Sequence, residues 1–110
     1  MTVEYIRYAV ADEGRGQELV SAYSRAALHL DAAPECLAYE LTQCEEDMNS
    51  WTLRIEWRST DEHMLGFRKG PHFPPFLAEI RGFLREIAEM RHYSLTAVRR
   101  RKLEPDATVL

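Results

Sequence analysis

The clearest alternation of apolar and polar residues runs from Trp51 to Arg58 and predicts a strand with one apolar face. Ile55 and Trp57 lie on that face. Ser59 or Thr60 follows at once, and either side chain can accept the free backbone N–H groups at the start of a helix. A tryptophan therefore ends a strand beside the start of a helix, which is a common place for a small-molecule pocket.

A period of two residues, typical of strands, and a period of about 3.6 residues, typical of helices, divide the remaining chain into short elements. Strands are predicted over 2–10, 37–42, 51–58 and 91–98, and helices over 17–30, over 61–67 and from Pro74 or Pro75 onward along an apolar stripe to Ile87. Asp12, Gly14 and Gly16 are expected to separate the first strand from the first helix.

This order, β-α-β-β-α-β, is that of a ferredoxin-like α+β domain, with both helices on one face of an antiparallel sheet. We expect a single domain over residues 1–98 and a polar tail over 99–110. The helices leave the other sheet face bare, and its polar members suit either water or a subunit contact. These members are Arg7, Glu40, Arg54 and Glu56.

Composition narrows the classes of function. A net charge of −4 over 110 residues argues against nucleic acid as a partner. No apolar run reaches the roughly 18 residues of a membrane span, and the first residues lack the pattern of a signal peptide, so we expect a cytoplasmic protein. Cys36 and Cys44 fall on one predicted strand, roughly 26 Å apart, and are not expected to bond to each other.

Several short stretches resemble the antibiotic biosynthesis monooxygenase domain. They are the first strand, LAYEL over 37–41, RIEWRS over 54–59 and HFPPF over 72–76, and the resemblance spans roughly residues 2–98. It implies a dimeric α+β barrel, in which two sheets pack face to face in a homodimer. Enzymes of this family include cofactor-free oxygenases of aromatic polyketides and quinols, and also heme-degrading relatives. In both groups a tryptophan matching Trp57 stands near a cavity between sheet and helices.

Two further features refine that resemblance. The heme-degrading branch uses an axial histidine on the following helix, where this chain has Pro74–Leu77, so the resemblance disfavours heme degradation even though His72 lies nearby. The segments EHMLGFRKG and EIAEMRHY are similar to the form of the domain that accompanies truncated hemoglobins. That form would imply a redox or oxygen-linked role.

His63 and His72 flank the break between the helical segments and are our candidate catalytic residues, as proton donors or acceptors, although surface or capping roles are the alternative. His92 is a weaker candidate. Trp57 is interpreted both as a core anchor and as a wall that stacks on a planar substrate. The other candidate substrate-binding residues, which could equally serve as packing, are Tyr8, Tyr39, Ile55 and Phe76.

No metal site is predicted, because the histidines lack a paired spacing and no cysteine cluster joins them. Glycine-rich cofactor motifs and a nucleophile elbow are also missing, so no cofactor is expected. Together with these missing motifs, the family resemblance implies a monooxygenase, an oxidoreductase that acts on a planar phenol, quinol or polyketide-like aromatic without metal or flavin. The alternative is a non-catalytic dimeric barrel that binds a small hydrophobic ligand or assists a heme protein. The expected partners are a small aromatic molecule and a second copy of the chain, with neither nucleic acid nor membrane.

Overall fold

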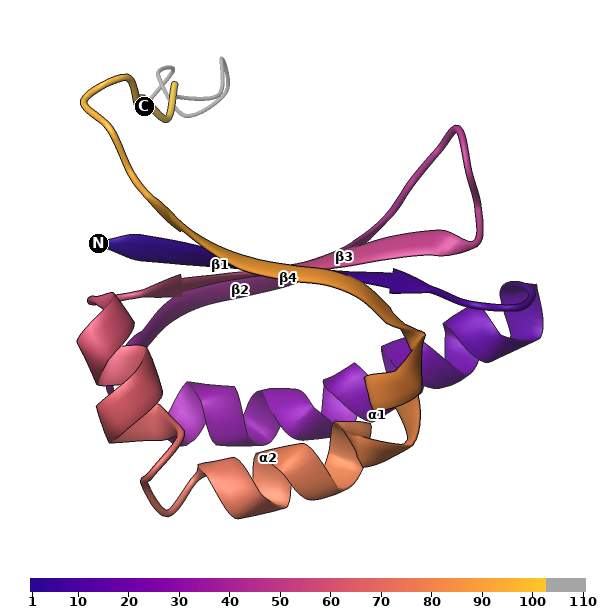
Figure 1. The fold of residues 1–110 in the computed structure, drawn as a ribbon, viewed down its shortest axis with the longest axis horizontal. Helices are drawn as coiled ribbons and strands as arrows, with labels where there is room; N and C mark the ends of the chain where they lie inside the picture. Colours follow the sequence, from indigo (N-terminus) through magenta and orange to yellow (C-terminus); the bar gives the residue numbers. More distant parts are fainter. Residues whose placement is uncertain (103–110) are drawn as a thin grey trace, which may run out of the picture.

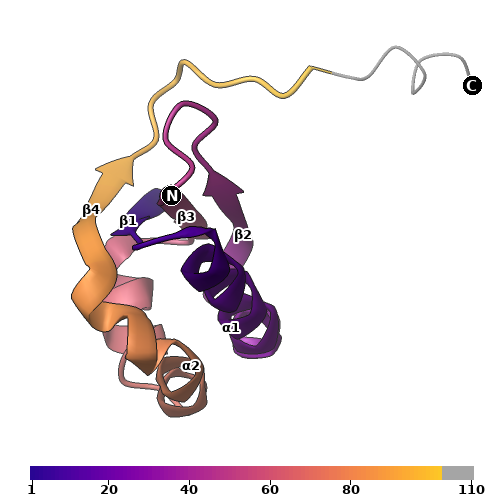
Figure 2. The ribbon, with the colours of Figure 1, turned by 90° about the vertical axis from the view of Figure 1, so that its right-hand side faces the viewer.

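The computed structural model describes residues 1–102, and the predicted tail beyond them lies outside the described residues. Four strands form one antiparallel sheet in the order β2-β3-β1-β4, and both helices cover the same face of it (Figures 1 and 2). The ferredoxin-like α+β fold is confirmed. The elements are β1 (Thr2–Ala9), α1 (Glu13–Ala32), β2 (Cys36–Gln43), β3 (Ser50–Trp57), the π-helix η1 (Glu62–Phe67), α2 (Phe73–Ile80), the 3-10 helix η2 (Arg81–Glu86) and β4 (Ile87–Ser94).

The first helix is longer than predicted, because the glycines expected to precede it lie inside it. The side chain of Asp12 accepts a hydrogen bond from the backbone N–H of Arg15 at 2.8 Å and so caps the helix before Glu13. Gly16 allows a close approach to the sheet, since a Cβ there would lie 2.8 Å from the indole of Trp51. Packing against this tryptophan therefore outweighs the low helix propensity of glycine.

The end of the second helical layer also differs from the prediction. The apolar stripe was expected to continue as helix to Ile87, but the α-helix ends at Ile80 and β4 already begins at Ile87 rather than at residue 91. Between them, the guanidinium of Arg15 on α1 donates to the carboxylate of Glu86 at 2.6 Å and to the carbonyl of Gly82 at 2.8 Å. These tertiary contacts accompany the tighter 3-10 turn, which a helical periodicity alone does not reveal.

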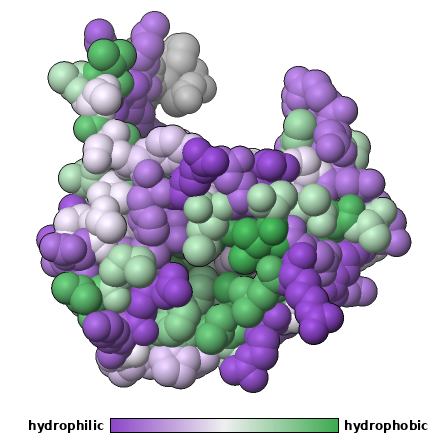
Figure 3. Space-filling view, in the orientation of Figure 1, coloured by the Kyte–Doolittle hydropathy of each residue, from purple (hydrophilic) through white to green (hydrophobic). Residues whose placement is uncertain are grey.

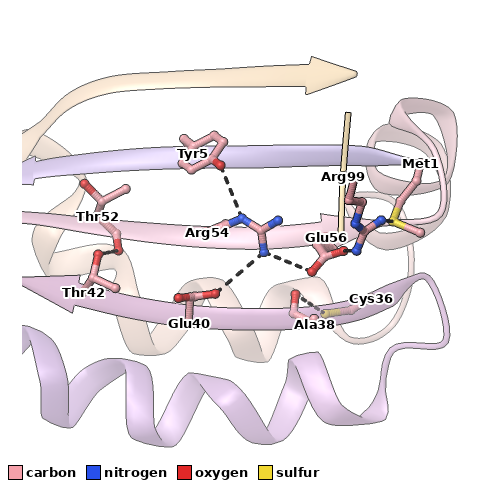
Figure 4. A network of polar contacts seen from close by, with 10 residues as sticks. All are labelled: Met1, Tyr5, Cys36, Ala38, Glu40, Thr42, Thr52, Arg54, Glu56 and Arg99. Carbon is pink, nitrogen blue, oxygen red and sulfur yellow. Dashed lines mark hydrogen bonds and ion pairs between the residues drawn. The ribbon is translucent and has the colours of Figure 1, made fainter. Parts of the chain in front are cut away.

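The sheet face away from the helices carries the polar residues that the alternation placed there (Figure 4). Arg54 donates to the carboxylate of Glu56 at 2.9 Å and to the hydroxyl of Tyr5 at 3.3 Å, and it lies 3.7 Å from the carboxylate of Glu40. Arg99, beyond β4, donates to the same Glu56 at 2.9 Å. This face is therefore polar, and its charged side chains form ion pairs and hydrogen bonds with one another.

Two remaining expectations concern cysteines and membranes. In the part of the chain that the structure describes, Cys36 and Cys44 are both free. Within residues 1–102, no helix is long and apolar enough to cross a membrane. The domain boundary at residue 98 stays a prediction.

Candidate functional site

A cavity of about 310 Å³ lies between the sheet and the helical segments. Figure 3 shows hydrophobic residues gathered around a hollow on this side of the molecule. The wall combines aliphatic side chains of the sheet with aromatic side chains of the helical segments, among them Ile6, Ile55, Phe67, Phe73, Phe76 and Ile80. A cavity of this size and character suits a small apolar or aromatic molecule.

Trp57 forms one wall of the cavity, at the end of β3, and is fully buried. The Ser59 hydroxyl accepts the backbone N–H of Glu62 at 3.0 Å, so the sequence predicted the helix start correctly. The π-helical turn then brings the imidazole of His63 onto the indole, with ring centroids 4.3 Å apart and planes within 13°. The ring of Phe67 lies 4.9 Å away on the same indole. Trp57 is thus both a core residue and part of the cavity wall.

Two polar side chains that line the cavity, Glu4 and His63, lie beside His92, and the three form what we term the Glu4–His63–His92 cluster. Glu4 on β1 and His92 on β4 are direct cross-strand partners, while His63 comes from η1. Nδ1 of His63 lies 2.7 Å from Nε2 of His92, within hydrogen-bond distance. The Glu4 carboxylate lies 3.6 Å from Nε2 of His63 and 3.8 Å from Nε2 of His92, and it accepts a hydrogen bond from Nε1 of Trp57 at 3.1 Å.

Burial dominates the electrostatics of this cluster. It raises the pKa of Glu4 to about 7, although the hydrogen bond from Trp57 and the charge of Arg68 act to lower it. Burial also lowers the pKa of His63 to about 3, assisted by His92 and Arg68, and it lowers the pKa of His92. Near neutral pH both imidazoles are therefore uncharged, while the Glu4 carboxyl group gains and loses its proton.

The arrangement has two chemical capacities. A carboxyl group with a pKa near 7 beside an apolar cavity suits proton transfer to or from a bound molecule. One carboxylate oxygen and one nitrogen from each imidazole also lie within 4.8 Å of one another, so these three side chains could hold a metal ion.

The structure brings together most of the predicted site residues. His63, Trp57, Ile55 and Phe76 line the cavity, as does Tyr8, whose hydroxyl lies at hydrogen-bond distance from that of Tyr23.

Two predicted residues lie elsewhere. Tyr39 donates its hydroxyl to the carboxylate of Asp31 at 2.6 Å and lines a separate groove between α1 and β2. His72 immediately precedes α2 and does not contribute to the cavity wall.

Glu4 is the residue that sequence reasoning missed. It shares a face of β1 with Ile6 and Tyr8, at spacings of two and four residues. All three side chains line the cavity. A carboxyl group in register with helix-facing residues was the available signal.

Comparisons with known proteins identify the family of the chain. The family model for the antibiotic biosynthesis monooxygenases matches residues 1–79. The uncharacterised protein YczJ of Bacillus subtilis is 25% identical over 81 residues, which cover 74% of this chain and 85% of that protein.

Solved structures show the same fold. A Bordetella bronchiseptica protein assigned to this family superposes with a TM-score of 0.69 at 21% identity, covering 86% of this chain and 96% of that one. SnoaB, a cofactor-independent oxygenase from Streptomyces nogalater, superposes with a TM-score of 0.64 at 19% identity, covering 90% and 94%. The chain therefore belongs to the antibiotic biosynthesis monooxygenase family.

Proposed function

We propose that this protein is a cofactor-independent monooxygenase of a planar phenol or quinol. The observation that carries the proposal is the aromatic-walled cavity lined by the buried side chains of Glu4 and His63, with His92 in contact with them. The family membership supports the reaction class, and SnoaB, a structural neighbour, is described as a cofactor-independent oxygenase.

In the proposed reaction, the aromatic ring binds against Trp57 and the apolar wall, with its hydroxyl toward the cluster. The Glu4 carboxylate accepts the phenolic proton, because its pKa near 7 matches the working pH of a general base. His63 is held between Trp57 and His92 and stays neutral, so it is suited to hydrogen bonding rather than to being the primary base.

The electrons come from the substrate itself. The phenolate transfers an electron to O₂, and the resulting radical pair combines to a hydroperoxide on the ring. Loss of water from that hydroperoxide leaves a new carbonyl group, so one oxygen atom enters the product and the other leaves as water. The substrate supplies both hydrogen atoms of that water, and no external reductant is consumed. The apolar wall limits access of bulk water to the reactive anion.

Oxygen uptake tests this proposal against the alternative of a non-catalytic binding protein. With a panel of quinols and anthrones, we expect protein-dependent O₂ consumption for at least one compound. The same compounds should quench tryptophan fluorescence, since Trp57 lines the cavity. Quenching without any O₂ uptake would instead support a ligand-binding protein or an accessory to a heme protein.

We further propose that two copies of the chain pair through the bare face of the sheet, as the family resemblance implies. Tyr5 and Tyr93 lie on that face with rings 5.4 Å apart, and they line a shallow hollow together with Thr52. Half-exposed aromatic side chains beside polar groups are typical of protein interfaces.

Analytical ultracentrifugation at micromolar concentration should therefore give twice the 12.8 kDa mass of the chain. Thr52→Arg would add a positive charge to the hollow directly opposite Arg7 on β1, with Arg91 in the same lining, and should shift the protein toward monomer. Ser21→Arg, on the exposed side of α1, is the matched control and should remain dimeric. A wild-type monomer would refute the proposed pairing.

A further inference from the structure

We propose that the Glu4–His63–His92 cluster binds one divalent transition metal ion, through a Glu4 oxygen and one nitrogen of each histidine. The three candidate ligand atoms lie within 4.8 Å of one another. They come from separate parts of the chain, but Glu4 and His92 are fixed as neighbours by the β1–β4 register. Two imidazoles and a carboxylate are a common ligand set for Zn²⁺ and for non-heme Fe²⁺.

The distances require only a small rearrangement. In a zinc site each nitrogen lies about 2.0–2.1 Å from the ion, which places two ligating nitrogens about 3 Å apart or slightly more. Nδ1 of His63 and Nε2 of His92 are 2.7 Å apart, so they would separate by roughly half an ångström as the ion replaces the shared proton. The His92 side chain can move outward, because 26% of it is exposed.

The surroundings of the ligands resemble an outer shell that holds a metal site in place. Oε1 of Glu4 accepts the N–H of Trp57 at 3.1 Å, which orients the carboxylate and leaves Oε2 toward His92. The indole also fixes the plane of the His63 ring by stacking. Hydrogen bonds of this kind to ligating carboxylates and imidazoles are typical of metal sites.

The composition of the cluster defines the class of ion. Nitrogen ligands favour Zn²⁺, Co²⁺ and Fe²⁺, whereas Mg²⁺ and Ca²⁺ prefer all-oxygen sites. Three protein ligands leave at least one coordination position for a water or a small ligand, and two of the three, Glu4 and His63, line the apolar cavity. Arg68, which lines the same cavity, opposes binding of a cation but does not supply a competing ligand.

Metal binding and proton acceptance exclude each other at Glu4, since one carboxylate does not perform both roles at once. The metal site therefore goes beyond the proposed reaction and does not depend on it. If both proposals hold, Zn²⁺ is expected to slow O₂ uptake.

Titration of the chelator-treated full chain with Co²⁺ tests the site directly. We expect visible absorption bands that saturate at one ion per chain and disappear when Zn²⁺ displaces Co²⁺, with no competition from Mg²⁺. Glu4→Gln and His92→Gln should each weaken Co²⁺ binding at least about 10-fold. Glu4→Gln keeps an acceptor oxygen for the Trp57 N–H, so the fold should survive, and circular dichroism checks this.

His29→Gln is the matched control, because His29 lies near the end of α1 and outside the cluster. Its affinity for Co²⁺ should equal that of the wild type. The metal site is refuted if Co²⁺ does not saturate at one ion per chain, if the cluster variants bind as tightly as the wild type, or if His29→Gln loses binding to the same extent. A chain that binds Co²⁺ as expected but consumes no O₂ with any substrate overturns the oxygenase proposal alone.

Discussion

Glu4→Gln is expected to lower O₂ uptake with a phenolic substrate about 100-fold or more, while the protein remains folded. The size of the effect is that of a lost general base. Glutamine has nearly the same shape and keeps an oxygen for the N–H of Trp57, but it does not accept a proton at neutral pH. The change therefore isolates proton transfer from packing.

The pH profile gives an independent measure of the same role. In the wild type the rate should rise with pH around the Glu4 pKa of about 7, because only the ionised carboxylate accepts the phenolic proton. This rise should be absent in Glu4→Gln. Glu45→Gln, in the exposed loop between β2 and β3, is the control and should retain both rate and profile. An unchanged rate in Glu4→Gln would mean that the substrate loses its proton elsewhere.

The alternation of residues was sufficient to predict the sheet and the position of Trp57. Period-2 patterns fix which side chains face the helices, and one face of this sheet is polar enough to make the alternation clear. The sequence also predicted the serine cap, because capping is a local interaction. Both patterns involve only residues that are close together in the sequence.

The polar cluster could not be found in the same way. Its members are 59 and 29 positions apart along the chain, and they meet because β1 pairs with β4 in a register that aligns Glu4 with His92. His63 and His72 looked equivalent in the sequence, as both flank the interruption of the helix. The π-helical turn directs His63 onto Trp57, whereas His72 only precedes α2.

The helix ends that the sequence predicted wrongly have a similar cause. Periodicity reports the apolar face of a segment but not the backbone geometry where a distant side chain binds to it. Arg15 contacts both the carbonyl of Gly82 and the carboxylate of Glu86 from α1. Such contacts between distant residues are invisible to a local pattern.

The second large effect is expected on the free energy of unfolding, when Trp57 on β3 is replaced. Trp51 on the same strand provides the matched control. Trp57→Phe should lower the free energy of unfolding by about 2 kcal/mol near pH 8, and Trp51→Phe by about 1 kcal/mol. Both indoles are buried against the helices, so the packing losses are similar. The N–H of Trp57 donates to Glu4, whereas the N–H of Trp51 has no partner among the residues that the structure describes. Only Trp57→Phe removes a hydrogen bond from a buried carboxylate.

The pH dependence distinguishes this cause from packing alone. Because the pKa of Glu4 is raised on folding from 4.5 to about 7, its contribution to stability is present below pH 4.5 and is lost as the pH rises through 7. The Trp57 N–H holds that pKa down, so its removal raises the pKa further and enlarges the loss at alkaline pH. Urea denaturation at about pH 5 and about pH 8 should therefore show a greater cost of Trp57→Phe at the higher pH, and an equal cost of Trp51→Phe at both. If the two variants share one pH dependence, the hydrogen bond to Glu4 has no part in stabilising the charged carboxylate.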